Sequence, residues 1–191
     1  MTQQLISVVL FAILILLAVG RAVMLRRKGV KAFVFGATDK SDFLLLPFVL
    51  AIIYTICSGA FGLPMWKPLV APFWTTLIPG WFGIALCIVA IICMGAALVS
   101  FGSSFRVGID EENPDKLVTT GIFAYTRNPI YVSFDMFFAG QFLIHRNIII
   151  AVAVVGFAFI IHRQIRREEN FLTSHYGTEY DEYRKKVRRY L

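Results

Sequence analysis

The chain has 191 residues, of which 58% are apolar and only 16% are charged. Because soluble domains carry about 25% charged residues, this balance excludes an ordinary soluble domain and favours a lipid bilayer as the surrounding solvent. The formal net charge of +7 is typical of membrane proteins whose basic loops face anionic lipid. No basic run is interleaved with aromatic residues, so we do not expect a nucleic-acid partner. The three cysteines lie in apolar runs without a pairing pattern, and we expect neither disulfides nor a metal site.

Three apolar runs, at residues 5–25, 43–63 and 80–100, are long enough to cross a membrane. A hydrocarbon core about 30 Å thick needs roughly 20 apolar residues in a helix. The first run follows the uncharged start MTQQ, which predicts a retained helix rather than a cleaved secretory signal.

Two shorter apolar runs follow at residues 130–144 and 148–161, separated by His145, Arg146 and Asn147. We expect them to form a tight helical hairpin in which His145 is a solvated turn residue. The sequence therefore predicts an all-α, polytopic membrane protein with about five transmembrane helices and a cytoplasmic helical tail.

The distribution of basic residues predicts the orientation of these helices. With five spans and the N-terminus outside, 17 of the 19 Lys and Arg residues fall on the cytoplasmic side, and only Lys67 and Arg146 fall outside. The outer loop also carries Trp66, Trp74 and Trp81, as an interfacial aromatic belt would. We expect an integral membrane protein with a cytoplasmic C-terminus, in a prokaryotic inner membrane.

Polar chemistry is concentrated in residues 104–131 and in the tail after residue 162, both on the predicted cytoplasmic side. We therefore divide the chain into a three-helix N-terminal part, 1–100, and a catalytic part, 101–191, which contains a cofactor loop, the hairpin 129–162 and the tail. Within the tail, Gly177 can end one helix in a left-handed conformation, and Thr178 with Asp181 predicts a capping box for the next. The tail is therefore expected to be folded.

The segment YTRNPIY, residues 125–131, places polar residues where an apolar helix begins. Pro129 suits the first turn of a helix and biases Asn128 towards an extended conformation. Arg127 and Asn128 are thereby presented next to unpaired backbone N–H groups, which favour an anionic or polar ligand. The alternative is that Arg127 only anchors the helix to lipid phosphates and Asn128 only caps it.

The acidic pair Glu168 and Glu169 follows the last apolar run within a basic cluster. Intrahelical pairing, for example Arg166 with Glu169, would support an exposed helix by only about 0.2–0.5 kcal/mol. Such pairing accounts for one glutamate better than for two, so a cationic partner or ligand is expected nearby.

Taken together, LVTTGIFAYTRNPIY and, about forty residues later, REENFLTSHYGTEYDEYRKKV resemble the integral-membrane methyltransferases that include isoprenylcysteine carboxyl methyltransferase and phospholipid methyltransferases. The resemblance covers residues 101–191. It rests on the order LV, G, R-N/H-P-x-Y, a helical hairpin, EE and a YG-x-x-Y-x-x-Y tail.

The resemblance implies a cytoplasmic pocket for S-adenosylmethionine that opens laterally to the membrane for a hydrophobic or amphiphilic acceptor. A carboxylate would hold the ammonium of this cofactor, amide and backbone N–H groups its carboxylate, and aromatic faces its sulfonium. The residues that the resemblance places against the cofactor are Lys116, Leu117, Val118, Phe123, Asn128, Pro129, Tyr131 and Glu168.

Catalytic roles are expected of Arg127, Gln164 and Glu169. Gln164 stands four positions before the first glutamate, where the resemblance to prenylcysteine methyltransferases places an arginine for the substrate carboxylate. Phe123 stands where the family often has an aromatic hydroxyl. A carboxylate or thiolate acceptor would need little acid–base help, whereas an amine would need a base, for which Glu169, His162 and His175 are candidates.

Asp135 is an ionisable residue within the expected fourth helix. Such a group costs about 2.5–3.5 kcal/mol on insertion scales and normally faces the interior of a helix bundle. It either lines a substrate tunnel or pairs with a structural partner such as Ser58 or Gln141.

Two other functions remain open at this point. Membrane sterol reductases have a similar C-terminal architecture with a nicotinamide cofactor, although they are usually longer. A small membrane scaffold or transporter subunit would use the polar tail only for docking. Membrane lipids are the expected partners, and the sequence does not define an oligomeric state.

Overall fold

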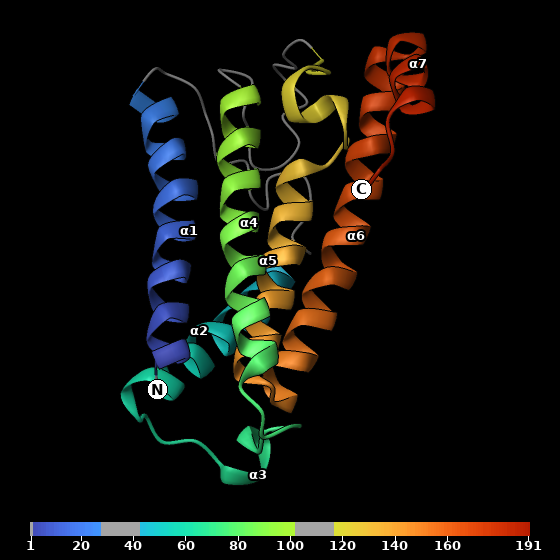
Figure 1. Ribbon diagram of the computed structural model, residues 1–191. Helices are drawn as coiled ribbons and strands as arrows, with labels where there is room; N and C mark the ends of the chain where they lie inside the picture. The colour runs from blue at the N-terminus through green and yellow to red at the C-terminus, as the bar shows by residue number, and fades with distance from the viewer. Residues whose placement is uncertain (1, 28–42, 102–116) are drawn as a thin grey trace.

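The computed structural model describes residues 2–27, 43–101 and 117–191. The long helices are α1 (Thr2–Arg27), α2 (Leu45–Phe61), α4 (Ile78–Phe101), α5 (Pro129–His145) and α6 (Ile148–Tyr176). The short elements are α3 (Lys67–Val70), the 3-10 helix Gly121–Ala124 and α7 (Thr178–Lys186). Figure 1 shows α1, α4, α5 and α6 side by side with α2 running obliquely behind them, and it places the N-terminus at one end of the bundle and α7 at the other. The all-α class is confirmed.

Three helices in the described part of the chain are long and apolar enough to cross a membrane: Thr2–Met24 within α1, α4 and α6. Helix α2 is apolar but has only 17 residues, which at a rise of 1.5 Å per residue gives about 26 Å. Helix α5 also has 17 residues. The expected crossings by α2 and α5 therefore stay a prediction.

The predicted hairpin is confirmed as α5 followed directly by α6. Arg146 takes the left-handed conformation, with φ 47°, between the two helices. The side-chain oxygen of Asn147 then accepts a hydrogen bond from the backbone N–H of Ile150 at 3.1 Å and caps α6. Helix α6 continues well beyond its apolar run to Tyr176, so the first part of the tail is a direct extension of the membrane helix.

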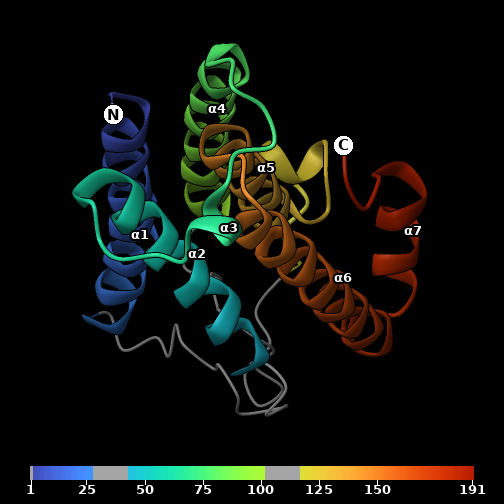
Figure 2. The same ribbon diagram turned by 90° about the horizontal axis from the view of Figure 1, so that it is seen from below.

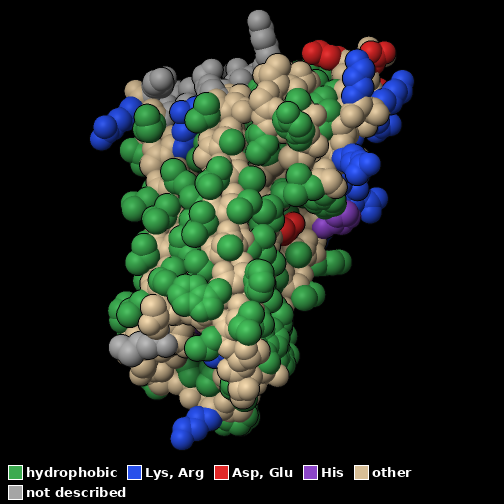
Figure 3. All heavy atoms as spheres, viewed as in Figure 1, with side chains coloured by type: hydrophobic (Ala, Val, Ile, Leu, Met, Phe, Trp, Pro, Cys, Tyr) green, Lys and Arg blue, Asp and Glu red, His purple; other side chains and the backbone are tan. Residues whose placement is uncertain are grey.

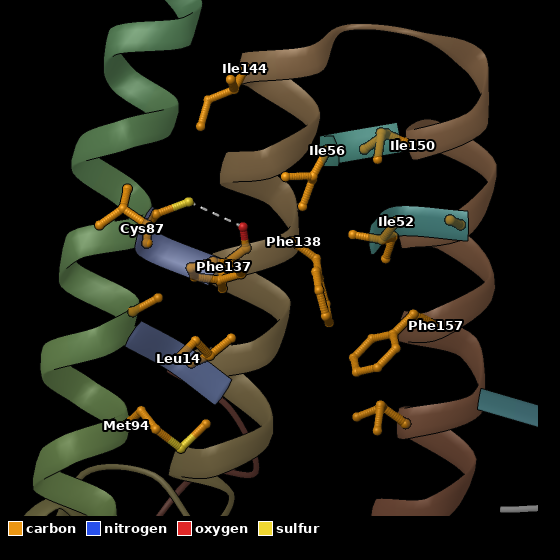
Figure 4. Close-up of a cluster of buried hydrophobic side chains, with 14 of the residues drawn as sticks. Leu14, Ile52, Ile56, Cys87, Met94, Phe137, Phe138, Ile144, Ile150 and Phe157 are labelled. Atoms are coloured by element: carbon orange, nitrogen blue, oxygen red, sulfur yellow. Dashed lines mark hydrogen bonds between the residues drawn. The ribbon is translucent and has the colours of Figure 1, made fainter. Parts of the chain in front are cut away.

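A buried cluster of apolar side chains fills the space between the long helices. Figure 4 shows Leu14 of α1, Met94 of α4 and Phe137 of α5 on one side of this cluster, and Ile52 of α2 and Phe157 of α6 on the other. Phe138 and Phe157 meet edge to face, with ring centroids 4.5 Å apart. The cluster thus joins the N-terminal helices to the hairpin.

Helices α4 and α5 are in close contact where Gly83 and Gly140 face one another. A Cβ on Gly140 would lie 2.6 Å from both the backbone oxygen of Gly83 and the sulfur of Cys87, which is closer than real Cβ contacts. Small residues that allow such backbone contact are typical of helix pairs in membranes.

The end of the bundle near the N-terminus contains a buried hydrogen-bonded network. The hydroxyl of Ser7 donates to the side-chain oxygen of Gln141 at 2.6 Å, and Nε2 of His145 lies 3.0 Å from the same hydroxyl oxygen. Since the single hydroxyl proton goes to Gln141, Nε2 of His145 must carry a proton and donate to Ser7. His145 is 7% exposed, so the prediction of a solvated turn residue is wrong.

We expect Ser7→Ala to destabilise the bundle by about 1 kcal/mol, because it leaves buried groups of Gln141 and His145 without their partner. Unfolding in mixed detergent micelles would measure this loss. Ser174→Ala, which removes an exposed hydroxyl on α6, is the control. Equal stability of the two variants would contradict the assignment of the network.

Charge is segregated along the bundle. Figure 3 shows Lys and Arg side chains gathered at the end that holds α7, above a largely apolar body. Among the described basic residues, Lys67 and Arg146 lie at the opposite end, with α3 and the α5–α6 turn. This segregation is the pattern that the sequence predicted for the described residues.

The chain turns sharply after α6 at Gly177, which has φ 54° and ψ −123°. The φ is positive as expected, but ψ lies outside the left-handed helical region. The predicted capping box is wrong, since Gly177 rather than Thr178 occupies the N-cap of α7, and no side-chain cap forms there. Figure 2 shows α7 standing beside the end of α6, with the C-terminus directed back towards the bundle.

Candidate functional site

The C-terminal segment after α7 pairs with the loop that precedes α5. Thr126 and Arg188 form an isolated parallel bridge, and the N–H of Arg127 donates to the carbonyl of Arg188 at 2.9 Å. The side-chain amide of Asn128 donates to the carbonyl of Arg189 at 3.1 Å. The prediction that the tail is folded is confirmed, and the tail lies against YTRNPIY.

Pro129 occupies the first turn of α5, as the sequence predicted, and Asn128 is the residue before it. The Asn128 side chain does not cap the helix, because its amide is directed to the tail. Asn128 is 8% exposed. The alternative role of Asn128 as a simple cap is therefore wrong.

Glu169 is the centre of a buried ion-pair cluster. One carboxylate oxygen lies 2.9 Å from Nη2 of Arg127, and the other accepts from Nε and Nη2 of Arg189 at 2.9 and 2.7 Å. The side chains of Glu169 and Arg127 are only 11% and 10% exposed. Such forked, charge-assisted bonds fix geometry as well as adding energy. The cluster therefore ties α6 to the loop before α5 and to the tail.

Glu168 faces a different set of side chains. Its Oε1 accepts from the hydroxyl of Tyr131 at 2.6 Å and from the side-chain amide of Gln164 at 3.0 Å. Arg167 in turn donates to the oxygen of Gln164 at 3.3 Å. The two adjacent glutamates thus have separate surroundings. Glu168 brings together Tyr131 and Gln164, two residues that the sequence singled out.

Phe123 is buried in the 3-10 helix that precedes YTRNPIY. Its ring meets that of Phe101 edge to face, with centroids 4.5 Å apart, and its carbonyl accepts from the hydroxyl of Tyr183 at 2.6 Å. Leu117 and Val118 are half-buried just before the 3-10 helix. Lys116, which the sequence also assigned to the cofactor, lies outside the described residues.

Two tail tyrosines are buried against this site. Burial raises the pKa of Tyr183 to about 12. Burial, and after it the charge of Glu169, raises the pKa of Tyr180 to about 12. A raised pKa means that the folded state holds the proton more tightly, so this stabilisation is present below pH 10 and is lost as the pH rises towards 12.

We therefore expect Tyr180 and Tyr183 to ionise near pH 12, well above the ordinary pKa of tyrosine near 10. A titration of tyrosinate absorbance in detergent would measure this, with Tyr180→Phe and Tyr183→Phe each removing part of the step near pH 12. Ionisation of all tyrosines together near pH 10 would contradict the buried docking of the tail.

The remaining candidates for a base are near the surface. Nδ1 of His162 shares a hydrogen bond with the hydroxyl of Tyr190 at 2.6 Å. His175 is exposed and stacks on Phe171, with ring centroids 5.7 Å apart. Tyr183, the last tyrosine of the YG-x-x-Y-x-x-Y tail, thus belongs to the site, and so do Arg189 and Tyr190, which the sequence did not single out. Their only signal was the basic, aromatic character of the C-terminus.

The fold and the site define a polytopic, helical integral membrane protein whose polar centre is assembled at one end of the bundle. The family model described as phospholipid methyltransferase matches residues 78–179, just over half of the chain. The chain belongs to this family.

Curated relatives share part of this chain. Over 105 residues it is 36% identical to the protein-S-isoprenylcysteine O-methyltransferase of Schizosaccharomyces pombe, covering 50% of this chain and 44% of the relative. Over 110 residues it is 34% identical to protein-S-isoprenylcysteine O-methyltransferase B of Arabidopsis thaliana, covering 56% and 55%. The chain thus spans about half the length of these relatives.

A solved structure of the eukaryotic intramembrane Ras methyltransferase, isoprenylcysteine carboxyl methyltransferase, has a related fold. The TM-score is 0.57 at 22% identity, covering 78% of this chain and 54% of the other. These comparisons support an integral membrane protein. The proteins named here are eukaryotic and give no support to the expected prokaryotic membrane.

Proposed function

We propose that this chain transfers a methyl group from S-adenosylmethionine to a hydrophobic acceptor at the cytoplasmic face of the membrane. One contact carries the proposal: the hydroxyl of Tyr131 lies 2.6 Å from the carboxylate of Glu168. This contact joins the R-N-P-x-Y element to the acidic pair, which are two of the motifs that carry the family resemblance. Membership of the phospholipid methyltransferase family supports the same reaction class.

The chemistry of the side chains around the site suits this cofactor. Glu168 is a carboxylate held by the hydroxyl of Tyr131 and the amide of Gln164, and a carboxylate can bind the ammonium group of an amino acid. Among the described residues, Nε of Arg127 and the hydroxyl of Tyr180 are buried and lack a hydrogen-bond partner. Both are donors that a ligand carboxylate could satisfy.

When bound, S-adenosylmethionine would supply an electrophilic methyl group on a positively charged sulfur. The protein has to align the acceptor atom with that methyl group and exclude water from both. We assign the binding of the cofactor ammonium to Glu168. Tyr131 and Gln164, which donate hydrogen bonds to the carboxylate of Glu168, orient that carboxylate. Asn128 and Pro129 shape the start of α5 beside them.

We assign Glu169 a positioning role rather than that of a base. Both of its carboxylate oxygens are engaged by guanidinium groups of Arg127 and Arg189. A carboxylate bound in this way holds Arg127 next to the site. Arg127 then contributes positive charge where an anionic group of the cofactor would bind.

The acceptor is proposed to be an amphiphile that enters from the bilayer, since the relatives above are named for isoprenylcysteine, a lipid-modified residue. The part 101–191 would carry the chemistry, and residues 1–100 would embed it in the membrane. The segregation of Lys and Arg favours a cytoplasmic location for the site.

Calorimetric titration of S-adenosylmethionine, and separately of NADPH, into the purified protein tests this function. We expect the first to bind and Glu168→Ala to weaken it at least tenfold, because a charge-assisted hydrogen bond contributes about 1.5–3 kcal/mol. Binding of NADPH alone would favour a reductase of the sterol-reductase type. Binding of neither would favour a non-enzymatic scaffold.

A further inference from the structure

Asp135 is an acidic residue in the middle of α5 that the proposed cofactor site does not use. Its Oδ1 is buried, and no residue in ranges 2–27, 43–101 and 117–191 donates a hydrogen bond to it. The structural partners that the sequence suggested do not reach it, because Ser58 donates to the carbonyl of Leu63 and Gln141 is bonded to Ser7 and Cys87. An acidic oxygen in this setting is suited to a donor that is not part of the described chain.

The surroundings of Asp135 place it beside the proposed cofactor site. It lies four residues after Tyr131 and therefore on the same face of α5, one turn deeper in the bundle. Tyr190 of the tail packs against the same buried apolar cluster as Tyr131 and Phe134, the residue before Asp135. Burial, and after it the negative charge of Asp135, raises the pKa of Tyr190. The hydroxyl of Tyr190 is in turn hydrogen-bonded to His162.

This cluster reaches the lateral surface of the protein. Asp135 is partly exposed and His162 is exposed. Figure 3 shows an acidic side chain next to a histidine on the apolar body, below the basic end of the molecule. A molecule that approaches from the bilayer would meet this polar spot among apolar side chains.

We propose that Asp135, flanked by Tyr190 and His162, binds the reacting end of the methyl acceptor, and that this end is an amine rather than a carboxylate. The inference rests on the proposed function. A carboxylate beside Asp135 would be repelled, whereas an ammonium group would be attracted and hydrogen-bonded.

The same residue can complete the proton balance of the reaction. An ammonium group has no lone pair, so it must lose a proton before it can attack. In a low-dielectric site an adjacent carboxylate and ammonium are both destabilised, and proton transfer from nitrogen to Asp135 yields two neutral groups. The nitrogen lone pair then forms the new N–C bond while the S–C bond of the donor breaks and its electrons stay on sulfur.

The test measures how tightly two radiolabelled probes of the same chain length, dodecylamine and dodecanoate, bind to the full chain in nanodiscs. The binding of each probe to empty nanodiscs is subtracted. Binding of S-adenosylmethionine is measured in parallel. We expect the wild type to bind dodecylamine at least tenfold more tightly than dodecanoate. Asp135→Asn should abolish this preference and leave the affinity for S-adenosylmethionine unchanged, while Asp135→Glu should retain part of the preference for the amine.

A second assay uses a labelled methyl donor with dodecylamine or phosphatidylethanolamine as the acceptor. It shows whether a single-chain amine or an amine-headed phospholipid is methylated.

Equal or tighter binding of dodecanoate by the wild type would overturn the proposal without reference to any variant. An amine preference that survives Asp135→Asn in folded protein would also overturn it. Failure of S-adenosylmethionine to bind the wild type would instead refute the proposed function, and the amine preference would still decide whether Asp135 is an amine site.

Discussion

Replacing Glu169 with alanine is expected to destabilise the protein by about 3 kcal/mol, because it leaves the buried guanidinium group of Arg127 without its counter-charge. This value is at the low end for a broken buried pair, since the side chain of Arg189 is 36% exposed and can be solvated. The loss would also release the C-terminal segment from the loop before α5. Equilibrium unfolding in mixed detergent micelles measures the first effect, and limited proteolysis of the tail measures the second.

Glu168→Ala is the matched control, because it removes the same group one position earlier in α6. Glu168 accepts from Tyr131 and Gln164 rather than from the Arg127–Arg189 cluster, so we expect a smaller loss of stability and an intact tail. The two variants should therefore separate folding from cofactor binding. Equal destabilisation by both would contradict the distinction drawn here between the two glutamates.

Gly140→Ala is expected to disrupt the contact between α4 and α5, at a cost of about 3 kcal/mol. The new Cβ would lie 2.6 Å from the backbone oxygen of Gly83 and from the sulfur of Cys87. Because a backbone oxygen cannot rotate away as the end of a flexible side chain can, α4 and α5 would have to separate. The same unfolding measurement detects the loss.

Gly95→Ala provides the control for this prediction within α4. A Cβ at Gly95 would meet nothing within 4 Å, and alanine favours a helix by up to about 1 kcal/mol over glycine. We expect this variant to be as stable as the wild type or slightly more stable. A neutral Gly140→Ala would show that the α4–α5 contact is looser than the structure describes.

The fold was largely predictable because apolar run length determines where a membrane helix can lie. The runs 5–25 and 80–100 became α1 and α4 with a few added residues at their ends. The end of α6 was not predictable in this way, since a charged helix that extends into water has no apolar signal. The burial of His145 was missed because its partner Ser7 is 138 positions away, and no local pattern reports such a contact.

The candidate site was predictable in its motifs but not in its pairing. The sequence singled out Arg127, Tyr131 and both glutamates, and the structure brings each glutamate to one of these residues. The sequence alone could not identify Arg189 among the many basic residues of the tail as the partner of Glu169. That pairing depends on the turn at Gly177 and on the return of the chain to Thr126.

Methyl transfer itself is the most direct test of the account. The full chain in membranes would be incubated with methyl-labelled S-adenosylmethionine and a mixture of amphiphilic acceptors, and the label recovered in organic solvent would be counted. We predict label above that of membranes without the protein, and at least a tenfold reduction for Glu168→Ala. Absence of label from the wild type, with each acceptor present and the protein folded, would contradict the assignment of this chain as a membrane methyltransferase.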